Sequence, residues 1–369
     1  MTAPGMRELR CCIHLHTYAS DGCGSIADIC AAATREGIDC VIITDHETLG
    51  HGMNGYAGKV LVLTGEEITP GYTERLDAAG TFIGSSVNNH LLALGIHQAI
   101  HGRDLSLQQS IDAIIAQGGL AFLCHPSEPG HPWTDWSVDH FAGIELWTFK
   151  AAWKRGASTS PTKAFACSNP DAVLDGPTTE ELARWDQLGH SRRIVAIGCS
   201  DNHAMRSLVD GVERTIFPWS VGVSTILSHI WVKPQELEAD PLSAVLGAVA
   251  SGRVIVAHDG LSPATGFVVT ASDINGCFAW PGEQITLARG LEINVSSPKA
   301  ATLRVLRDGV IVQELQGTAC STHVDVPGVW RVEAHLGDRP WVFANPFYID
   351  LPSGCATVMQ TPQIMIEPK

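Results

Sequence analysis

The sequence predicts an α/β fold, a parallel sheet or barrel, followed by a small all-β sandwich. Three observations support this. Strand and helix patterns alternate through the first two thirds of the chain. After Pro263 short strand patterns follow one another without a helix. The 369 residues exceed what one core usually serves. We therefore expect two domains, residues 1–262 and 263–369.

The first domain contains buried strands separated by capped helices. Ser25 and Ser106 precede helical patterns as N-caps, and Asp240 precedes a helix with Pro241 in its first turn. Expected helices run from Ser25 to near Gly37, over Leu107–Gln117, over Glu180–Leu188 and over Pro241–Ser251. Expected strands are Cys11–Leu15, Cys40–Thr44, Val60–Thr64, Leu91–Ile96, Leu120–Cys124, Gly143–Trp147 and Ile194–Gly198.

Two segments of this domain have no regular pattern, Ser127–Asp139 and Thr148–Pro177. Loops of this length in a compact domain are usually lids, binding loops or disordered segments. The second segment carries a local excess of cationic residues, namely Lys150, Lys154, Arg155 and Lys163.

The second domain is expected to be a small antiparallel β-sandwich. Asp308-Gly309 separates two strand patterns by two residues and indicates a tight hairpin. The expected strands are Gly266–Thr270, Leu291–Ser296, Leu303–Arg307, Val310–Leu315, Trp330–Leu336 and Phe347–Leu351.

Composition narrows the class of protein. The net charge of −15 disfavours nucleic acid as a partner, because phosphate neutralisation by Lys and Arg drives that binding. No apolar stretch is long enough to cross a membrane, and the start contains no signal-peptide pattern. The eleven cysteines are irregularly spaced, and several lie within apolar runs. This pattern favours reduced, buried cysteines in a cytoplasmic protein over a disulfide framework.

Histidines and carboxylates occur at the ends of the expected strands. Such strand ends converge on one face of a βα barrel. A single histidine of this kind is more often a core or surface residue, but nine groups at five or more strand ends favour a shared metal site. Imidazole with carboxylate suits Zn, Mn or Fe. The nine residues are His14, His16, Asp21, His46, Glu67, His90, His125, Asp201 and His203.

These motifs resemble the PHP (polymerase and histidinol phosphatase) family. The similarity covers about residues 10 to 260 and includes His14-Leu-His16 with Asp21, Asp45-His46, Gly65-Glu-Glu67, His125-Pro126 and Asp201-Asn-His203. The resemblance implies a distorted (β/α)7 TIM-like barrel, and the C-terminal strands resemble the immunoglobulin-like domain attached to some stand-alone family members. It also implies a stand-alone, metal-dependent phosphoesterase with three divalent transition-metal ions, Zn, Mn or Fe. It implies one ion bound by His14, His16, Glu67 and Asp201, a second by Asp21, His46 and His203, and a third by Glu67, His90 and His125. Glu66 could compete with Glu67, although the Gly-x-Glu spacing favours Glu67.

The expected reaction is hydrolysis of a small phosphomonoester by a metal-bound hydroxide, so the expected partner is a small phosphorylated molecule. Glu67 and Asp201 would act through the metals. Asp45 is a candidate general acid, although orientation of a ligand is its more common role. Lys150, Lys154, Arg155 and Arg206 could contact the substrate, although each alone also fits an ordinary solvated surface.

Two other functions stay open at the sequence level. A phosphodiesterase acting on a nucleotide or cyclic phosphate would use the same metals. A regulatory module that binds metal structurally is disfavoured, because structural sites are usually closed and lack a shared carboxylate. The sequence identifies neither the substrate nor the oligomeric state.

Overall fold

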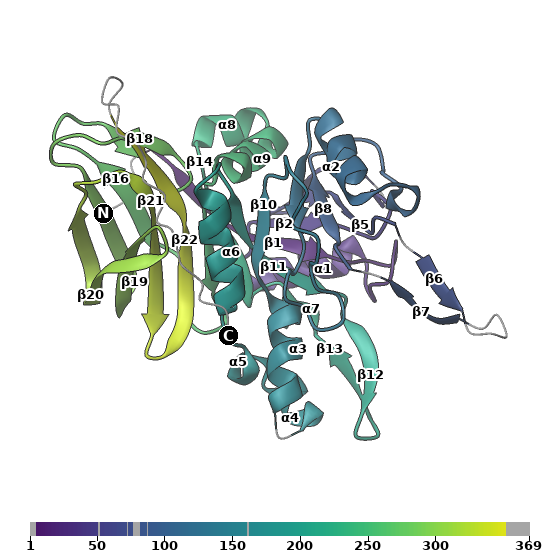
Figure 1. Ribbon diagram of the computed structural model, residues 1–369. Helices are drawn as coiled ribbons and strands as arrows, with labels where there is room; N and C mark the ends of the chain where they lie inside the picture. Colours follow the sequence, from purple (N-terminus) through teal and green to yellow (C-terminus); the bar gives the residue numbers. More distant parts are fainter. Residues whose placement is uncertain are drawn as a thin grey trace, which may run out of the picture.

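The computed structural model describes residues 5–50, 52–71, 73–76, 82–86, 88–160 and 162–351. It is a mixed α/β structure dominated by β-sheet (Figure 1). The N-terminal strands and most helices lie on one side of the molecule, and the C-terminal strands lie on the other (Figure 1). The expected domain boundary at 262/263 stays a prediction. The last eighteen residues of the expected second domain, 352–369, lie outside the described residues.

The N-terminal strands pair in the order β4-β2-β1-β11-β10-β9-β8-β5. The pairings from β4 to β9 are parallel, whereas β8 pairs antiparallel with both β9 and β5. The bounds are β1 Arg7–Leu15, β2 Cys40–Ile43, β4 Val60–Thr64, β5 Glu66–Ile68, β8 Leu91–Leu94, β9 Leu120–Leu123, β10 Gly143–Thr148 and β11 Val195–Asn202.

The α/β class is confirmed, but a closed TIM-like barrel of the expected (β/α)7 kind is not shown. β8 runs antiparallel to both β5 and β9, and the described residues between β5 and β8 include no helix. β14 (Ile226–Val232) also pairs antiparallel with the start of β1, and β15 (Val254–His258) continues from it. β3 (Gly55–Ala57) adds a further antiparallel edge beside β4.

The expected helices form with the expected caps. Ser25 and Ser106 each accept a hydrogen bond from the third residue of their helix, and both caps are reciprocal capping boxes. Asp240 caps its helix through Ser243, and Gly37 ends the first helix in the left-handed region. These helices are α1 Ile26–Glu36, α2 Leu107–Ala116, α6 Thr179–Gly189 and α9 Pro241–Ser251, with the shorter η1 Gly102–Asp104, α7 Trp219–Gly222 and α8 Pro234–Ala239 between them.

The prediction of an irregular Thr148–Pro177 segment is wrong. It folds into α3 (Phe149–Thr159), α4 (Lys163–Ser168) and α5 (Pro170–Val173). Tertiary packing decides this: Trp153 is buried and its ring packs against Phe217, a contact with no local sequence signal. Gly156 permits the close approach of α3 to α5, since a Cβ there would lie 1.8 Å from the carbonyl oxygen of Val173. The Ser127–Asp139 segment is irregular, as expected.

The C-terminal strands form, but a separate sandwich is not confirmed. β22 pairs with β15, so these strands continue the N-terminal sheet, and Trp231 and Ile255 share their hydrophobic core. Asp308 and Gly309 make the expected two-residue hairpin, both with positive φ (52° and 78°). The strands are β16 Val268–Ser272, β17 Phe278–Ala279, β18 Gln284–Thr286, β19 Glu292–Arg307, β20 Val310–His323, β21 Gly328–Leu336 and β22 Arg339–Asp350.

Two hairpins project from the body (Figure 1): β6 (Thr73–Leu76) with β7 (Phe82–Ser86), and β12 (Met205–Val209) with β13 (Val212–Ile216). Among the described residues, no helix has the length and apolar character required to cross a membrane. All ten cysteines in the described part of the chain are free thiols.

Candidate metal centre

The nine predicted ligands come from one edge of the N-terminal sheet. His14 and His16 lie at the end of β1, His46 follows β2, and His125 follows β9. His90 precedes β8, and because β8 is antiparallel to β9, its start lies at the edge where β9 ends. The remaining members are Glu67 in β5, Asp201 near the end of β11, His203 just after it, and Asp21 in the loop after β1.

Glu67 lies at the centre of this group. Its Oε2 is 3.0 Å from Nε2 of His14, 3.1 Å from Nε2 of His16 and 3.4 Å from Nε2 of His46. Its Oε1 is 2.6 Å from Nδ1 of His90 and 3.2 Å from Nε2 of His125. Each carboxylate oxygen therefore meets a different set of histidines, which is the geometry of a bridging ligand.

Two aspartates complete the group on the side of β11. Oδ1 of Asp201 lies 3.4 Å from Nε2 of His16 and 3.6 Å from Nε2 of His14. Oδ1 of Asp21 lies 3.2 Å from Nε2 of His203 and 3.8 Å from Nε2 of His46.

The donor atoms fall into groups of metal-site size. One set of atoms within 4.8 Å of one another is His14, His16, Glu67 and Asp201, and another is His16, Asp21, His46 and His203. These match the first and second ligand sets that the family resemblance implies, with His16 added to the second. The third implied set does not come together in this way. Glu67 and His125 group with Cys124, whereas His90 meets Glu67 at 2.6 Å without joining that group.

The donor chemistry fits divalent transition metals. Nε2 of His16 and Nε2 of His90 are buried and meet no partner in hydrogen-bonding geometry in the described structure. Buried polar atoms without partners are rare and call for an explanation such as an ion. Imidazole nitrogens with carboxylate oxygens are a Zn, Mn or Fe donor set. The residues present therefore fit such ions.

Ionisation in the metal-free protein is set by burial and by the mutual charges of the cluster. Burial lowers the pKa of His46 to about 4, so its imidazole is neutral near pH 7 and can ligate a metal. Burial also lowers the pKa of His14 and His125, but neighbouring carboxylates outweigh it: the pKa of His14 rises, and that of His125 rises to about 9. The histidines hold the pKa of Glu67 below its usual range against the effect of burial. Metal binding would therefore release protons.

Strained backbone marks three of the ligand positions. His14, His125 and Asp201 have positive φ angles of 70°, 29° and 54°. Non-glycine residues rarely adopt this region and gather at functional sites when they do. The pairing of β1 also shifts register between Ile13 and Leu15, which is where His14 lies. Bulges of this kind re-aim a side chain, and they place His14 and His16 on the same cluster.

Asp45 holds a loop and does not face the cluster. Its side chain is buried, and it accepts hydrogen bonds from the Thr17 amide (2.6 Å), the Thr17 hydroxyl (2.7 Å) and the Ser20 hydroxyl (2.6 Å). These contacts fix the loop that presents Asp21. They fit the ligand-orienting alternative for Asp45, and its role as a general acid stays a prediction. Glu66 is likewise turned away, accepting from the Ile100 amide at 2.9 Å.

Of the four predicted substrate contacts, two lie at the cluster. Nζ of Lys150 is 3.0 Å from Oδ2 of Asp201, and Lys154, one helical turn later on α3, pairs with Glu128. Arg155 pairs with Asp175 and donates to Ser127. Arg206 lies on the β12–β13 hairpin, pairs with Glu213, and is 76% exposed. Within the described part of the chain, the hydrogen bonds and ion pairs of these two arginines include no predicted ligand.

Sequence reasoning missed two buried carboxylates beside the histidines. Glu145 in β10 lies with Oε1 2.6 Å from Nδ1 of His14. Glu128 follows His125 by three residues, and its Oε2 is 3.1 Å from Nδ1 of His125. A signal for Glu145 was present, because a charged residue within the apolar run Gly143–Trp147 is rarely fully buried without a partner.

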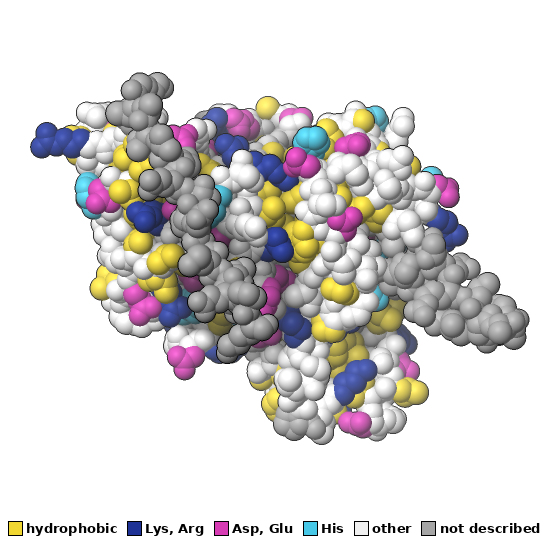
Figure 2. All heavy atoms as spheres, viewed as in Figure 1, with side chains coloured by type: hydrophobic (Ala, Val, Ile, Leu, Met, Phe, Trp, Pro, Cys, Tyr) yellow, Lys and Arg dark blue, Asp and Glu magenta, His cyan; other side chains and the backbone are white. Residues whose placement is uncertain are grey.

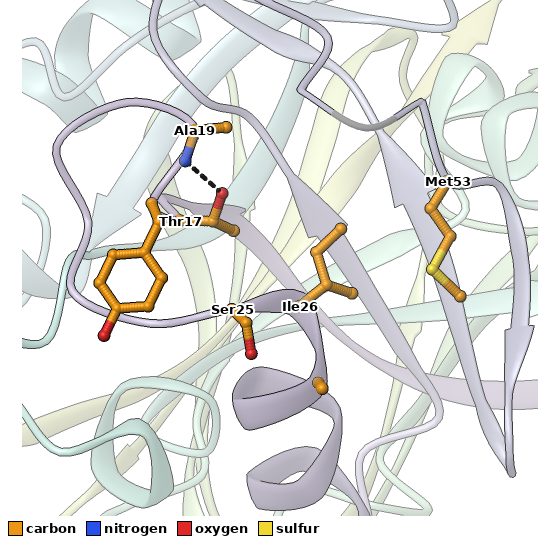
Figure 3. A pocket seen from close by; sticks show the side chains of 7 residues that line it. Thr17, Ala19, Ser25, Ile26 and Met53 are labelled. Atoms are coloured by element: carbon orange, nitrogen blue, oxygen red, sulfur yellow. Dashed lines mark hydrogen bonds between the residues drawn. The ribbon is translucent and has the colours of Figure 1, made fainter.

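A small hollow of about 290 Å³ adjoins the loop between His16 and Ser25 (Figure 3). Thr17 at its wall accepts a hydrogen bond from the Ala19 amide at 3.1 Å (Figure 3). None of the thirteen residues predicted to ligate metal or contact substrate lines this hollow. Its lining residues are Thr17, Tyr18, Ala19, Ser25, Ile26, Ala27 and Met53.

Comparison with known proteins gives structural neighbours only. No protein-family model and no curated protein matches the chain. A two-domain protein containing a predicted PHP-like metal-dependent phosphoesterase from Bacteroides vulgatus is 15% identical, with a TM-score of 0.42, covering 93% of this chain and 96% of that one. A metal-dependent phosphoesterase from Bifidobacterium adolescentis is 17% identical (TM-score 0.33; 52% and 87% covered). An amidohydrolase from Chromobacterium violaceum, with bound sulfate and no metal, is 15% identical (TM-score 0.33; 57% and 92% covered).

Proposed function

We propose that this protein is a phosphomonoesterase that uses three divalent transition-metal ions held by the nine residues around Glu67. The observation that carries the proposal is the position of Glu67, whose two buried oxygens each meet separate histidines. A carboxylate shared in this way suits a catalytic cluster better than a closed structural site. When bound, such ions acidify a coordinated water and stabilise the entering and leaving oxygens of phosphate.

The protein side chains would supply binding and orientation. Lys150 lies over Asp201, and although burial opposes its charge, Asp201, Glu128 and Glu67 raise its pKa, so it stays cationic at working pH. Lys150 and Lys154 would bind the phosphate oxygens that the ions leave free, and their two charges favour a dianionic monoester over a monoanionic diester. Asp45 would hold the Thr17–Ser20 loop and with it Asp21.

The charge distribution on the outer surface is also compatible with a small substrate rather than a nucleic acid. On the face drawn in Figure 2, Lys and Arg side chains are scattered among acidic and neutral ones without a continuous basic band. A nucleic-acid groove would need such a band.

The test is a screen of monoesters and diesters with Mn- or Zn-loaded protein, together with elemental analysis of the bound metal. We expect three ions per chain and turnover of monoesters. His16→Ala and Asp201→Asn should lose at least 100-fold in kcat/KM, whereas His97→Ala, which changes an exposed histidine, should match the wild type. Turnover of diesters alone, or full turnover by His16→Ala, would overturn the proposal.

Lys150 provides the discriminating variant for the substrate class. Lys150→Met should raise KM for monoesters while leaving the metal content at the wild-type value, because its ammonium group cannot ligate a metal. An unchanged KM would remove Lys150 from the binding site.

A further inference from the structure

Glu145 is an ionisable residue in the middle of an apolar strand. Its neighbours Ile144, Leu146 and Trp147 are buried core residues, and Glu145 itself is fully buried. A buried carboxylate is costly unless it is hydrogen-bonded on several sides. The contacts that stabilise Glu145 therefore indicate which residues it positions.

Each oxygen of Glu145 contacts a residue that is a predicted metal ligand. Oε1 is 2.6 Å from Nδ1 of His14. Oε2 accepts the backbone N–H of His125 at 2.8 Å and the hydroxyl of Thr148 at 3.1 Å. One side chain on β10 thus joins ligand positions at the ends of β1 and β9.

These contacts determine which His14 nitrogen is available. With a proton on Nδ1 donated to Glu145, the lone pair of His14 lies on Nε2. Nε2 is the atom that faces the cluster, 3.0 Å from Oε2 of Glu67. A carboxylate behind a ligating imidazole fixes its tautomer and ring orientation, and it increases the basicity of the ligand.

The contacts also stabilise unusual backbone. His14 and His125 both have positive φ, and β10 itself shifts register between Glu145 and Trp147. Positive φ at bulky residues is strained and persists only where the surroundings enforce it. Glu145 enforces it from the side chain of one ligand and the amide of the other.

Glu145 is not well placed to be a ligand itself, although His14, Cys124 and Glu145 have donor atoms within 4.8 Å. Two donors on one tetrahedral ion are about 3.3 Å apart. The 2.6 Å between Oε1 and Nδ1 is a direct hydrogen bond and leaves no room for an ion between them.

We propose that Glu145 is a positioning residue of the metal centre, which orients His14 through its imidazole and His125 through its amide. The proposal rests on the proposed function, since it assumes that these histidines bind metal.

The experiment measures binding of Mn²⁺ alone by equilibrium dialysis, with bound ions counted by elemental analysis, for the wild type, Glu145→Ala and Glu145→Gln. Second-sphere changes of this kind typically cost 10–100-fold in metal affinity. We expect Glu145→Ala to weaken Mn²⁺ binding by that factor at unchanged saturating stoichiometry. Glu145→Gln, which keeps an acceptor oxygen for His14, should recover part of the loss.

Glu66→Gln is the matched control. Glu66 is a buried carboxyl beside Glu67, but it bonds to the Ile100 amide. The substituted amide keeps the shape of the carboxyl and an acceptor oxygen for that bond. The Mn²⁺ affinity of this variant should equal that of the wild type. Circular dichroism checks that each variant is folded, and if Glu145→Ala does not fold, Glu145→Gln decides the test.

The outcomes are separable. Wild-type affinity in both Glu145 variants would overturn the positioning role while leaving the proposed function intact. Loss of one ion per chain in Glu145→Gln would show that Glu145 is a ligand and would also overturn it. A wild type that binds no Mn²⁺ would remove the proposed function and this inference together.

Discussion

His229 forms a buried charged link away from the metal centre and gives the sharpest test of the structure. It lies in β14, with Nδ1 2.7 Å from Oε1 of Glu8 and Nε2 2.9 Å from Oδ1 of Asp259. Asp259 also pairs with Arg10 at 3.0 Å. Burial lowers the pKa of His229, but hydrogen bonds and charges from Asp259 and Glu8 outweigh it and raise the pKa from 6.5 to about 9. The folded protein therefore binds this proton more tightly than the unfolded chain.

The size and sign follow from linkage. A rise of about 2.5 pKa units corresponds to about 3 kcal/mol of unfolding free energy. Because the folded pKa lies above the unfolded one, this contribution is fully present below pH 6.5 and is lost as the pH rises through 9. Histidines of the metal centre with raised pKa values, such as His125, add their own pH-dependent stability over the same range. The contribution of His229 is therefore isolated as the difference between the wild type and a variant.

The assay is urea unfolding of the metal-free protein at pH 6 and pH 9.5, followed by tryptophan fluorescence. For the wild type minus His229→Gln, the difference in unfolding free energy should be up to about 3 kcal/mol larger at pH 6 than at pH 9.5. His97→Gln, at an exposed histidine, should keep the wild-type pH dependence. If His229→Gln lost as much stability between the two pH values as the wild type, the buried link would be wrong.

Four further changes have expected outcomes. Ser25→Ala removes the cap of α1 and should lower the unfolding free energy by about 1 kcal/mol in urea; no change would contradict the capping box. Gly22→Ala would put a Cβ 2.2 Å from the His16 carbonyl oxygen, so it should displace the Asp21 loop and weaken Mn²⁺ binding, as dialysis would show; wild-type affinity would argue against this packing. Gly247 lies in the exposed middle of α9 with open space at the Cβ position, so Gly247→Ala should raise the unfolding free energy by about 0.5–1 kcal/mol. An unfolding free energy below that of the wild type would contradict this placement of Gly247. Chelation should lower the melting temperature of the metal-loaded wild type, because bound metal adds about 2.7 kcal/mol to the unfolding free energy when the free ion is at 100 times its Kd. The melting temperature of His16→Ala should not change on chelation.

Much of the local structure was predictable because its causes are local. The capping boxes at Ser25 and Ser106, the Asp308-Gly309 turn and the buried apolar strands all formed as expected. The antiparallel placement of β8 was not predictable, because an apolar run of four to six residues reads the same in either direction. The helices over Phe149–Val173 escaped prediction because Trp153 and Gly156 matter through residues distant in sequence.

The sequence alone predicted the candidate metal ligands, because histidines and carboxylates follow the ends of its apolar strand patterns. How these side chains meet depends on the tertiary fold. It placed each Glu67 oxygen against different histidines, turned Asp45 and Glu66 away from the cluster, and put Glu145 behind His14. The physical reason is that these relations depend on which strands are neighbours and on bulges that re-aim single residues, and neither leaves a local pattern in the chain.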